Sequence, residues 1–109
     1  MSAVEEFEGT GLHELLQEEG RGVLVDFWSP WCAPCRTLRP HIARLAGERQ
    51  AEWRFVAVNT VAQPAVAEDF QVKSLPTIAF FRGGQELFRF QGMATLSGIV
   101  EKLDELSKS

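Results

Sequence analysis

Apolar residues recur along the chain at two spacings, one typical of helices and one typical of buried strands. Four segments place apolar residues every three or four positions with charges between them, which predicts amphipathic helices. These helices begin at Leu12, just after Pro34, at Pro64 and, behind a capping Thr95, at Leu96. Five other segments are short runs rich in Val, Ile, Phe and Trp, which predicts strands. The predicted strands cover residues 4–7, 23–28, 53–59, 77–81 and 86–91.

The strand at residues 23–28 is apolar on both of its alternating faces except at Asp26, as expected for a strand covered on both sides. Gly83 and Gly84 separate the last two strands, and this short glycine turn favours an antiparallel hairpin. The order βαβαβαββα predicts an α/β fold with a mixed five-stranded sheet flanked by four helices. Because 109 residues suffice for one such core, we expect a single domain over residues 1–109.

The charge of the chain narrows the classes of function. The net charge is -4 and the 11 Lys and Arg are scattered, so the composition argues against a nucleic-acid ligand. Residues 1–20 carry acids where a signal peptide needs basic residues and an apolar stretch, so we expect a cytoplasmic protein in a reducing compartment. No membrane partner is indicated, and a monomer is the default expectation.

Cys32 and Cys35 are the two cysteines of the chain, and their spacing is compatible with four interpretations. They could be half of a zinc site with His13 and His41, but these histidines lack ligand-pair spacing. A purely structural disulfide would contribute little, because the closed loop is nearly the shortest one there is. Two inert core cysteines fit poorly with a sequence that indicates a surface turn opening a helix. A redox pair explains the arrangement best.

The redox reading requires one thiolate that attacks a target disulfide and a second thiol that releases the mixed disulfide. If a helix begins near Cys32, its free N–H groups and positive dipole end stabilise the thiolate of Cys32. Cys35 then lies one turn deeper, and Arg36 adds a fixed positive charge. The spacing therefore suits both tasks.

Asp26 is the second residue that suggests chemistry. An ionised carboxylate inside an apolar strand is costly, so we expect burial to raise the pKa of Asp26 toward neutrality. A structural aspartate, satisfied by backbone or water, is the alternative interpretation.

Three stretches carry a family resemblance: "VDFWSPWCAPCR" at 25–36, "KSLPTIAFFRGG" at 73–84 and "FQGM" at 90–93. In order and separation they resemble the landmarks of the thioredoxin family over the whole chain. Arg36, "VNT" at 58–60 and "FRGG" at 81–84 most resemble the second bacterial type of thioredoxin, without its zinc-binding N-terminal module.

The resemblance implies roles for individual residues. Cys32 would be the exposed nucleophile, Cys35 the resolving cysteine, and Asp26 the group that helps to deprotonate Cys35. Sequence alone predicts a trans bond before Pro76, since few X-Pro bonds are cis, whereas the resemblance implies a cis bond. The backbone of Leu75 would then pair with an extended substrate. The implied apolar groove consists of Trp31, Ala33, Pro34, Leu75, Pro76 and Gly92, with Met93 beside it.

Some positions depart from the family pattern. A lysine usually aligns with Ala57, on the strand beside Asp26, and without that cation we expect a higher Asp26 pKa than is usual for the family. Ala33 replaces the usual glycine between the cysteines, and because alanine favours helix more than glycine does, we expect a shift in dipole alignment and redox potential. Arg36 replaces a lysine and keeps its charge, so little change is expected. Trp28 could shield the active site or belong to the core.

These observations predict a thioredoxin-like protein-disulfide reductase that cycles between a Cys32–Cys35 dithiol and disulfide. No bound cofactor is required. The resemblance implies regeneration by a flavin-dependent thioredoxin reductase using NADPH. Two alternatives stay open at this point: a thiol oxidant or isomerase, and a thioredoxin-like binding protein or co-chaperone that barely uses its redox couple.

Overall fold

Nine elements build the fold in a computed structural model that describes residues 3–107. The strands are β1 (Val4–Glu6), β2 (Gly22–Trp28), β3 (Trp53–Asn59), β4 (Thr77–Arg82) and β5 (Gln85–Gln91). The helices are α1 (Leu12–Glu18), α2 (Ala33–Arg49), α3 (Pro64–Asp69) and α4 (Leu96–Ser107). This order confirms the predicted βαβαβαββα arrangement.

The strands form one mixed sheet in the order β1-β3-β2-β4-β5. β1 and β2 both run parallel to β3, whereas β4 is antiparallel to β2 and to β5. β2 lies at the centre and is buried over six of its seven residues, as the apolar residues on both of its faces predicted. Gly83 and Gly84 have positive φ angles in the β4–β5 turn, which confirms the predicted hairpin.

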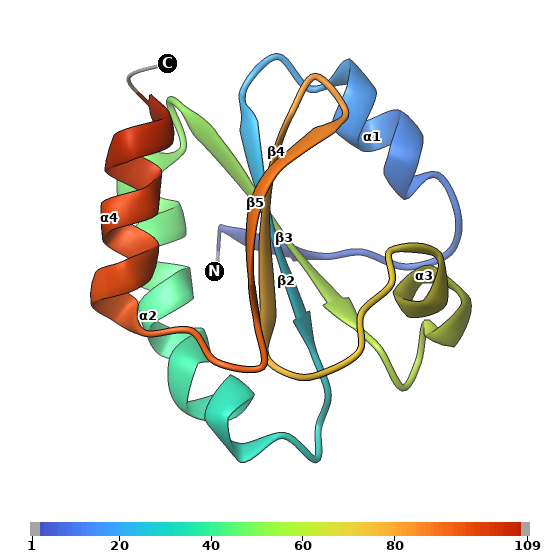
Figure 1. Ribbon diagram of the computed structural model, residues 1–109. Coiled ribbons are helices and arrows are strands. Elements are labelled where there is room, and N and C mark those ends of the chain that lie inside the picture. The colour runs from blue at the N-terminus through green and yellow to red at the C-terminus, as the bar shows by residue number, and fades with distance from the viewer. Residues whose placement is uncertain (1–2, 108–109) are drawn as a thin grey trace.

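Two layers of helices cover the sheet, one on each face (Figure 1). Helices α2 and α4 pack on one face, where Ile42, Leu45, Ile99 and Leu103 join the first core cluster. Helices α1 and α3 cover the other face, where Leu12, Leu16 and Phe70 join the second cluster. None of the described helices is long and apolar enough to cross a membrane.

The sheet register brings three loops to one end of the sheet. Phe27 near the end of β2 pairs with Thr77 at the start of β4, and Thr77 pairs with Gln91 at the end of β5. The chain therefore leaves β2 toward Cys32, enters β4 from Pro76 and leaves β5 toward Gly92 at the same end of the sheet. Figure 1 shows these loops together at the lower end of the sheet.

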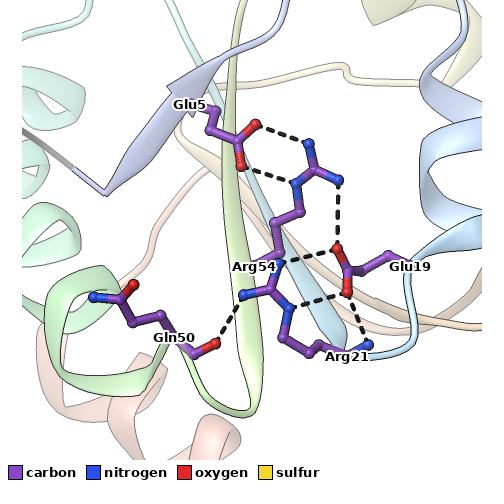
Figure 2. Close-up of polar contacts among 5 residues, drawn as sticks. All are labelled: Glu5, Glu19, Arg21, Gln50 and Arg54. Carbon is purple, nitrogen blue, oxygen red and sulfur yellow. Dashed lines mark hydrogen bonds and ion pairs between the residues drawn. The ribbon is translucent and has the colours of Figure 1, made fainter.

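A charged network lies near the opposite end of the sheet (Figure 2). Arg54 on β3 donates two hydrogen bonds of 2.8 Å to the Glu5 carboxylate and also reaches Glu19 at 3.4 Å. Arg21 donates to Glu19 through Nε at 2.9 Å and to the Gln50 carbonyl through Nη1 at 2.8 Å. The side-chain hydrogen bonds from Arg21 contribute most to lowering the pKa of Glu19 to about 2. This network ties β1 and β3 to the segment that leads into β2.

Candidate active site

Cys32 and Cys35 lie where the β2–α2 loop becomes helix, and they are joined by a disulfide bond. Cys32 is the N-cap of α2, with the extended backbone that such a cap requires. Cys35 lies one turn into the helix and is only 3% exposed, whereas Cys32 is partly exposed. The structure is therefore the oxidised form of the pair, with one sulfur nearer to solvent than the other.

The first turn of α2 directs its backbone donors toward Cys32. The Cys35 N–H donates a 3.2 Å hydrogen bond to Cys32 Sγ, and the Arg36 N–H donates to the Cys32 carbonyl at 3.2 Å. N–H groups at a helix N-terminus carry a partial positive charge, so they favour a thiolate at this position. Helix α2 thus provides what a nucleophilic cysteine requires.

Arg36 stabilises the loop in front of the cysteines. Its Nη1 donates a 2.7 Å hydrogen bond to the Pro30 carbonyl, while the Cys32 N–H donates to the Ser29 carbonyl at 3.2 Å. The sequence indicated only that Arg36 keeps a positive charge. The contact with Pro30 adds a structural task, because it holds the chain between β2 and α2 in place.

Asp26 is buried in the middle of β2, 1% exposed, on the sheet face that α2 covers. Burial raises the pKa of this carboxyl to about 6, in the direction predicted from the sequence. The Arg39 guanidinium opposes that rise, and the negative charge of Glu6 adds to it. Among the described residues, Asp26 Oδ1 has no hydrogen-bond partner. The carboxyl is thus able to hold a proton near neutral pH.

The missing lysine at position 57 does not leave Asp26 without a cation, because Arg39 of α2 supplies one. Arg39 Nε lies 3.4 Å from Asp26 Oδ2, and Arg39 Nη1 donates a 2.7 Å hydrogen bond to Glu6 Oε1. Ala57 does lack a charge, but the cation comes from a helix instead of the neighbouring strand. One signal in the sequence could have indicated it: Arg39 follows Cys35 by four residues, which places both on the same face of a helix.

Trp28 packs against the core and lines the same cavity as Cys35. It packs against the core cluster under α2 and α4, and its Nε1 donates a 3.3 Å hydrogen bond to Glu6 Oε2. It also lines a cavity of about 240 Å³ together with Cys35, Arg36, Arg39 and Pro40. The indole therefore belongs to the packing of the core, and its shielding of the active site stays a prediction.

The Leu75–Pro76 peptide bond is cis, as the resemblance implied. The Gly92 N–H donates a 2.9 Å hydrogen bond to the Pro76 carbonyl, which ties the end of β5 to the start of β4. Gly92 has a φ of +85°, and a Cβ atom there would come within 3.0 Å of Ser74 Oγ, so this close approach requires glycine. Leu75 has no backbone hydrogen bond to the other described residues.

The implied groove residues differ in how much surface they offer. Trp31 is 81% exposed and Met93 is 75% exposed, and Ala33, Pro34 and Gly92 are also exposed. Pro76 is buried and Leu75 is half-buried, so these two contribute mainly backbone. That all of these residues act as one groove stays a prediction.

The residues considered for zinc do not come together around the cysteines. The described part of the chain contains no group of three or more His, Cys, Asp or Glu that could hold a metal ion. His13 lies 2.6 Å from an Asp69 carboxylate oxygen and stacks on Phe70 with a centroid distance of 4.4 Å. His41 lies on α2. Nothing in this part of the chain supports the zinc interpretation.

A redox-active Cys-x-x-Cys disulfide at a helix N-terminus, on a sheet of this topology, defines a thiol-disulfide oxidoreductase with a thioredoxin fold. The comparisons with known proteins agree: a family model described as thioredoxin matches residues 3–105. The chain is 35% identical over 105 residues to thioredoxin 1 of Nostoc sp., covering 94% of this chain and 98% of that protein. The chain belongs to the thioredoxin family.

Two further relatives extend the comparison. The chloroplastic thioredoxin M-type of Chlamydomonas reinhardtii is 39% identical over 83 residues, which cover 76% of this chain and 59% of that longer protein. Among solved structures, the thioredoxin Mala s 13 of Malassezia sympodialis has a TM-score of 0.87 and 22% identity, covering 98% of this chain and 93% of that chain. At 22% identity, the similarity to Mala s 13 shows the fold alone. The specific likeness to the second bacterial type stays a prediction.

Membership of this family and the Cys32–Cys35 pair make the chain a protein-disulfide oxidoreductase that works by dithiol/disulfide exchange.

Proposed function

We propose that the chain works as a reductant of protein disulfides, with Cys32 as the attacking thiol and Cys35 as the resolving thiol. The observation that carries this assignment is the asymmetry of the pair. Cys32 is partly exposed and accepts a hydrogen bond from the first turn of α2, whereas Cys35 is buried. A bulky protein disulfide can approach the first sulfur more easily than the second.

The exchange then has two steps. The Cys32 thiolate attacks one sulfur of the target disulfide, so a Cys32–target disulfide forms and the other target sulfur leaves as a thiolate that takes up a proton. Cys35, once deprotonated, attacks Cys32 Sγ, which closes the Cys32–Cys35 disulfide and releases the second target thiolate. Two electrons and two protons pass in total from the dithiol to the target.

Asp26 acts in this proposal as the general base for Cys35. A carboxylate with a pKa of about 6 is mostly ionised at pH 7 and still basic enough to accept a proton efficiently. Arg39 connects the two groups, since it contacts Asp26 and lines the same cavity as Cys35. Substituting Asp26 with alanine should slow the resolving step near pH 7, and an unchanged rate would contradict this role.

Substrates bind, in this proposal, in the apolar groove around the cysteines, with the Leu75 backbone pairing with an extended target segment. The exposed surfaces of Trp31 and Met93 support this location. So does the backbone of Leu75, which makes no hydrogen bond to the backbone of another described residue. A small groove of this kind suits weak and varied protein partners.

Regeneration of the dithiol needs an external electron donor, and we propose an NADPH-dependent, flavin-containing thioredoxin reductase. We further propose that residues 1–109 function as one monomeric domain in the cytoplasm, transferring electrons for redox homeostasis without a bound cofactor. This assignment of the electron donor would be supported if NADPH is oxidised only when the reductase, this protein and a disulfide substrate are all present.

Trapping experiments test the assignment of the two cysteines. The reduced Cys35→Ser variant should accumulate a covalent adduct with insulin, a protein with accessible disulfides, through Cys32. The matched Cys32→Ser variant should form little adduct, because its remaining thiol is buried. Adducts detected by non-reducing electrophoresis mainly with Cys32→Ser would reverse the assignment.

The exposed apolar side chains Trp31 and Met93 also favour a second candidate, a binding or co-chaperone role that uses the same surface. A Cys32→Ser/Cys35→Ser double variant separates the two functions. Full function of this variant in cells would support the binding role, whereas loss of function supports the reductase.

A further inference from the structure

Arg39 lies between two carboxylates of the sheet face that α2 covers. Its Nη1 donates a 2.7 Å hydrogen bond to Glu6 Oε1, and its Nε lies 3.4 Å from Asp26 Oδ2. The sheet register places Glu6 of β1 beside Ala57 of β3, and Ala57 beside Asp26 of β2. The guanidinium therefore bridges two carboxylates across the small side chain of a fully buried alanine.

Two further contacts fix this position of the guanidinium. Arg39 Cζ lies 4.9 Å from the centre of the Trp28 ring, within the range of a cation–π interaction. The Trp28 Nε1 donates to the other Glu6 oxygen at 3.3 Å. The Glu6 carboxylate therefore binds both the Arg39 guanidinium and the Trp28 indole. The Arg39 side chain is 29% exposed, which leaves it connected to solvent while its inner nitrogen reaches the buried Asp26.

We propose that Arg39 is a positioning residue for the disulfide exchange: anchored by Glu6 and Trp28, it stabilises the ionised, proton-accepting form of Asp26. This inference rests on the proposed role of Asp26 as the base for Cys35, and it adds the residue that keeps the base ionised at working pH.

The charges around Asp26 decide the sign of this effect. Arg39 of α2 favours the carboxylate and opposes burial, whereas Glu6 of β1 disfavours it. The neighbours of Asp26 in the sheet, Ala57 and Ile78, are uncharged. Cys35 of α2 lines the same cavity as Arg39 and is neutral in the disulfide. Arg39 is thus the positive charge that offsets burial among the described groups facing this carboxyl.

Removing the charge of Arg39 should make Asp26 harder to ionise. An opposite charge within about 4–6 Å lowers a carboxyl pKa by roughly 1–3 units. In the Arg39→Met variant, which keeps an apolar stem over Trp28, Asp26 should therefore titrate at least about one pH unit higher than in the unmodified protein. If the resolving rate follows the ionised fraction of Asp26, it should fall about fivefold at pH 6 and about twofold at pH 7.

The experiment titrates the Asp26 carboxyl directly by carbon-13 NMR in the oxidised protein and measures the rate of mixed-disulfide resolution against pH. Arg39→Lys keeps a cation and should largely retain both profiles. Arg39→Ala/Ala57→Lys moves the cation to the neighbouring strand and should bring the titration back toward that of the unmodified protein. Arg49→Ala is the matched control, because Arg49 lies on the same helix, is 25% exposed and pairs with Asp104.

The outcomes separate this inference from the proposed function. An Asp26 titration in Arg39→Met that stays within a few tenths of a pH unit of the unmodified protein would overturn the role of Arg39. An equal shift in Arg49→Ala would overturn it as well, since the effect would then be general. If Arg39→Met shifts the titration but Asp26→Asn does not slow resolution, Arg39 tunes Asp26 and the assignment of Asp26 as the base fails instead.

Discussion

Replacing Asp26 with asparagine should change how the stability of the oxidised protein depends on pH. Asparagine has nearly the same shape and cannot ionise, so the variant removes the buried charge while leaving the packing of β2 almost unchanged. The pKa of Asp26 is about 6 in the folded protein and 3.8 in the unfolded reference. A group whose pKa is raised on folding contributes stability below its unfolded pKa, and this contribution is lost as the pH rises through the folded value.

The size of the effect follows from the two pKa values. A difference of about 2 units corresponds to about 3 kcal/mol, at about 1.4 kcal/mol per unit. The unmodified protein should therefore lose about 3 kcal/mol relative to Asp26→Asn between pH 3.5 and pH 8. Because other carboxylates titrate equally in both proteins, their contributions cancel in the comparison. The variant should be clearly the more stable protein at pH 8.

Urea unfolding of both oxidised proteins, followed by tryptophan fluorescence at several pH values, measures this difference. Glu101→Gln is the control, because Glu101 is an exposed carboxyl of α4 and its removal should give a difference that is small at every pH. A difference between Asp26→Asn and the unmodified protein that stays constant from pH 4 to pH 8 would refute the reasoning.

Three further substitutions test the packing and the charged network. Glu19→Gln should lower the unfolding free energy at pH 7 by about 1–2 kcal/mol after allowance for solvent screening. Because the Arg21 contact lowers the pKa of Glu19, urea unfolding should show this deficit shrinking as the pH falls from 4.5 toward 2. Gly22→Ala should cost about 1–3 kcal/mol, since the new Cβ would lie 2.6 Å from atoms of the buried Trp53 ring, and an unchanged melting temperature would contradict this. Gly47→Ala, in open space on α2, should instead stabilise the protein by up to about 1 kcal/mol, and a lower melting temperature would be the contrary result.

Much of the fold could be predicted because local patterns carry it. The apolar run around Asp26 identified the central strand, the Gly83–Gly84 turn identified the hairpin, and the spacing of Cys32 and Cys35 at a helix start identified the redox pair. Each of these signals lies within one short stretch of sequence.

The contacts that could not be predicted join residues far apart in the chain. Arg39 and Glu6 are 33 positions apart, and only the docking of α2 on the sheet brings them together. The same holds for Arg54 and Glu5, 49 positions apart, whose pairing depends on the register between β1 and β3. In sequence, each of these residues resembles any other charged surface residue. For this reason the contact between Arg39 and Asp26 was not predicted.

The reduction potential of the Cys32–Cys35 pair, measured by equilibration with glutathione at pH 7, tests the reductase proposal most directly. The proposal predicts a value below about -230 mV, in the range of thioredoxin-like electron donors. A value near or above about -200 mV would place the protein with isomerases and oxidants and would contradict the proposed direction of electron flow.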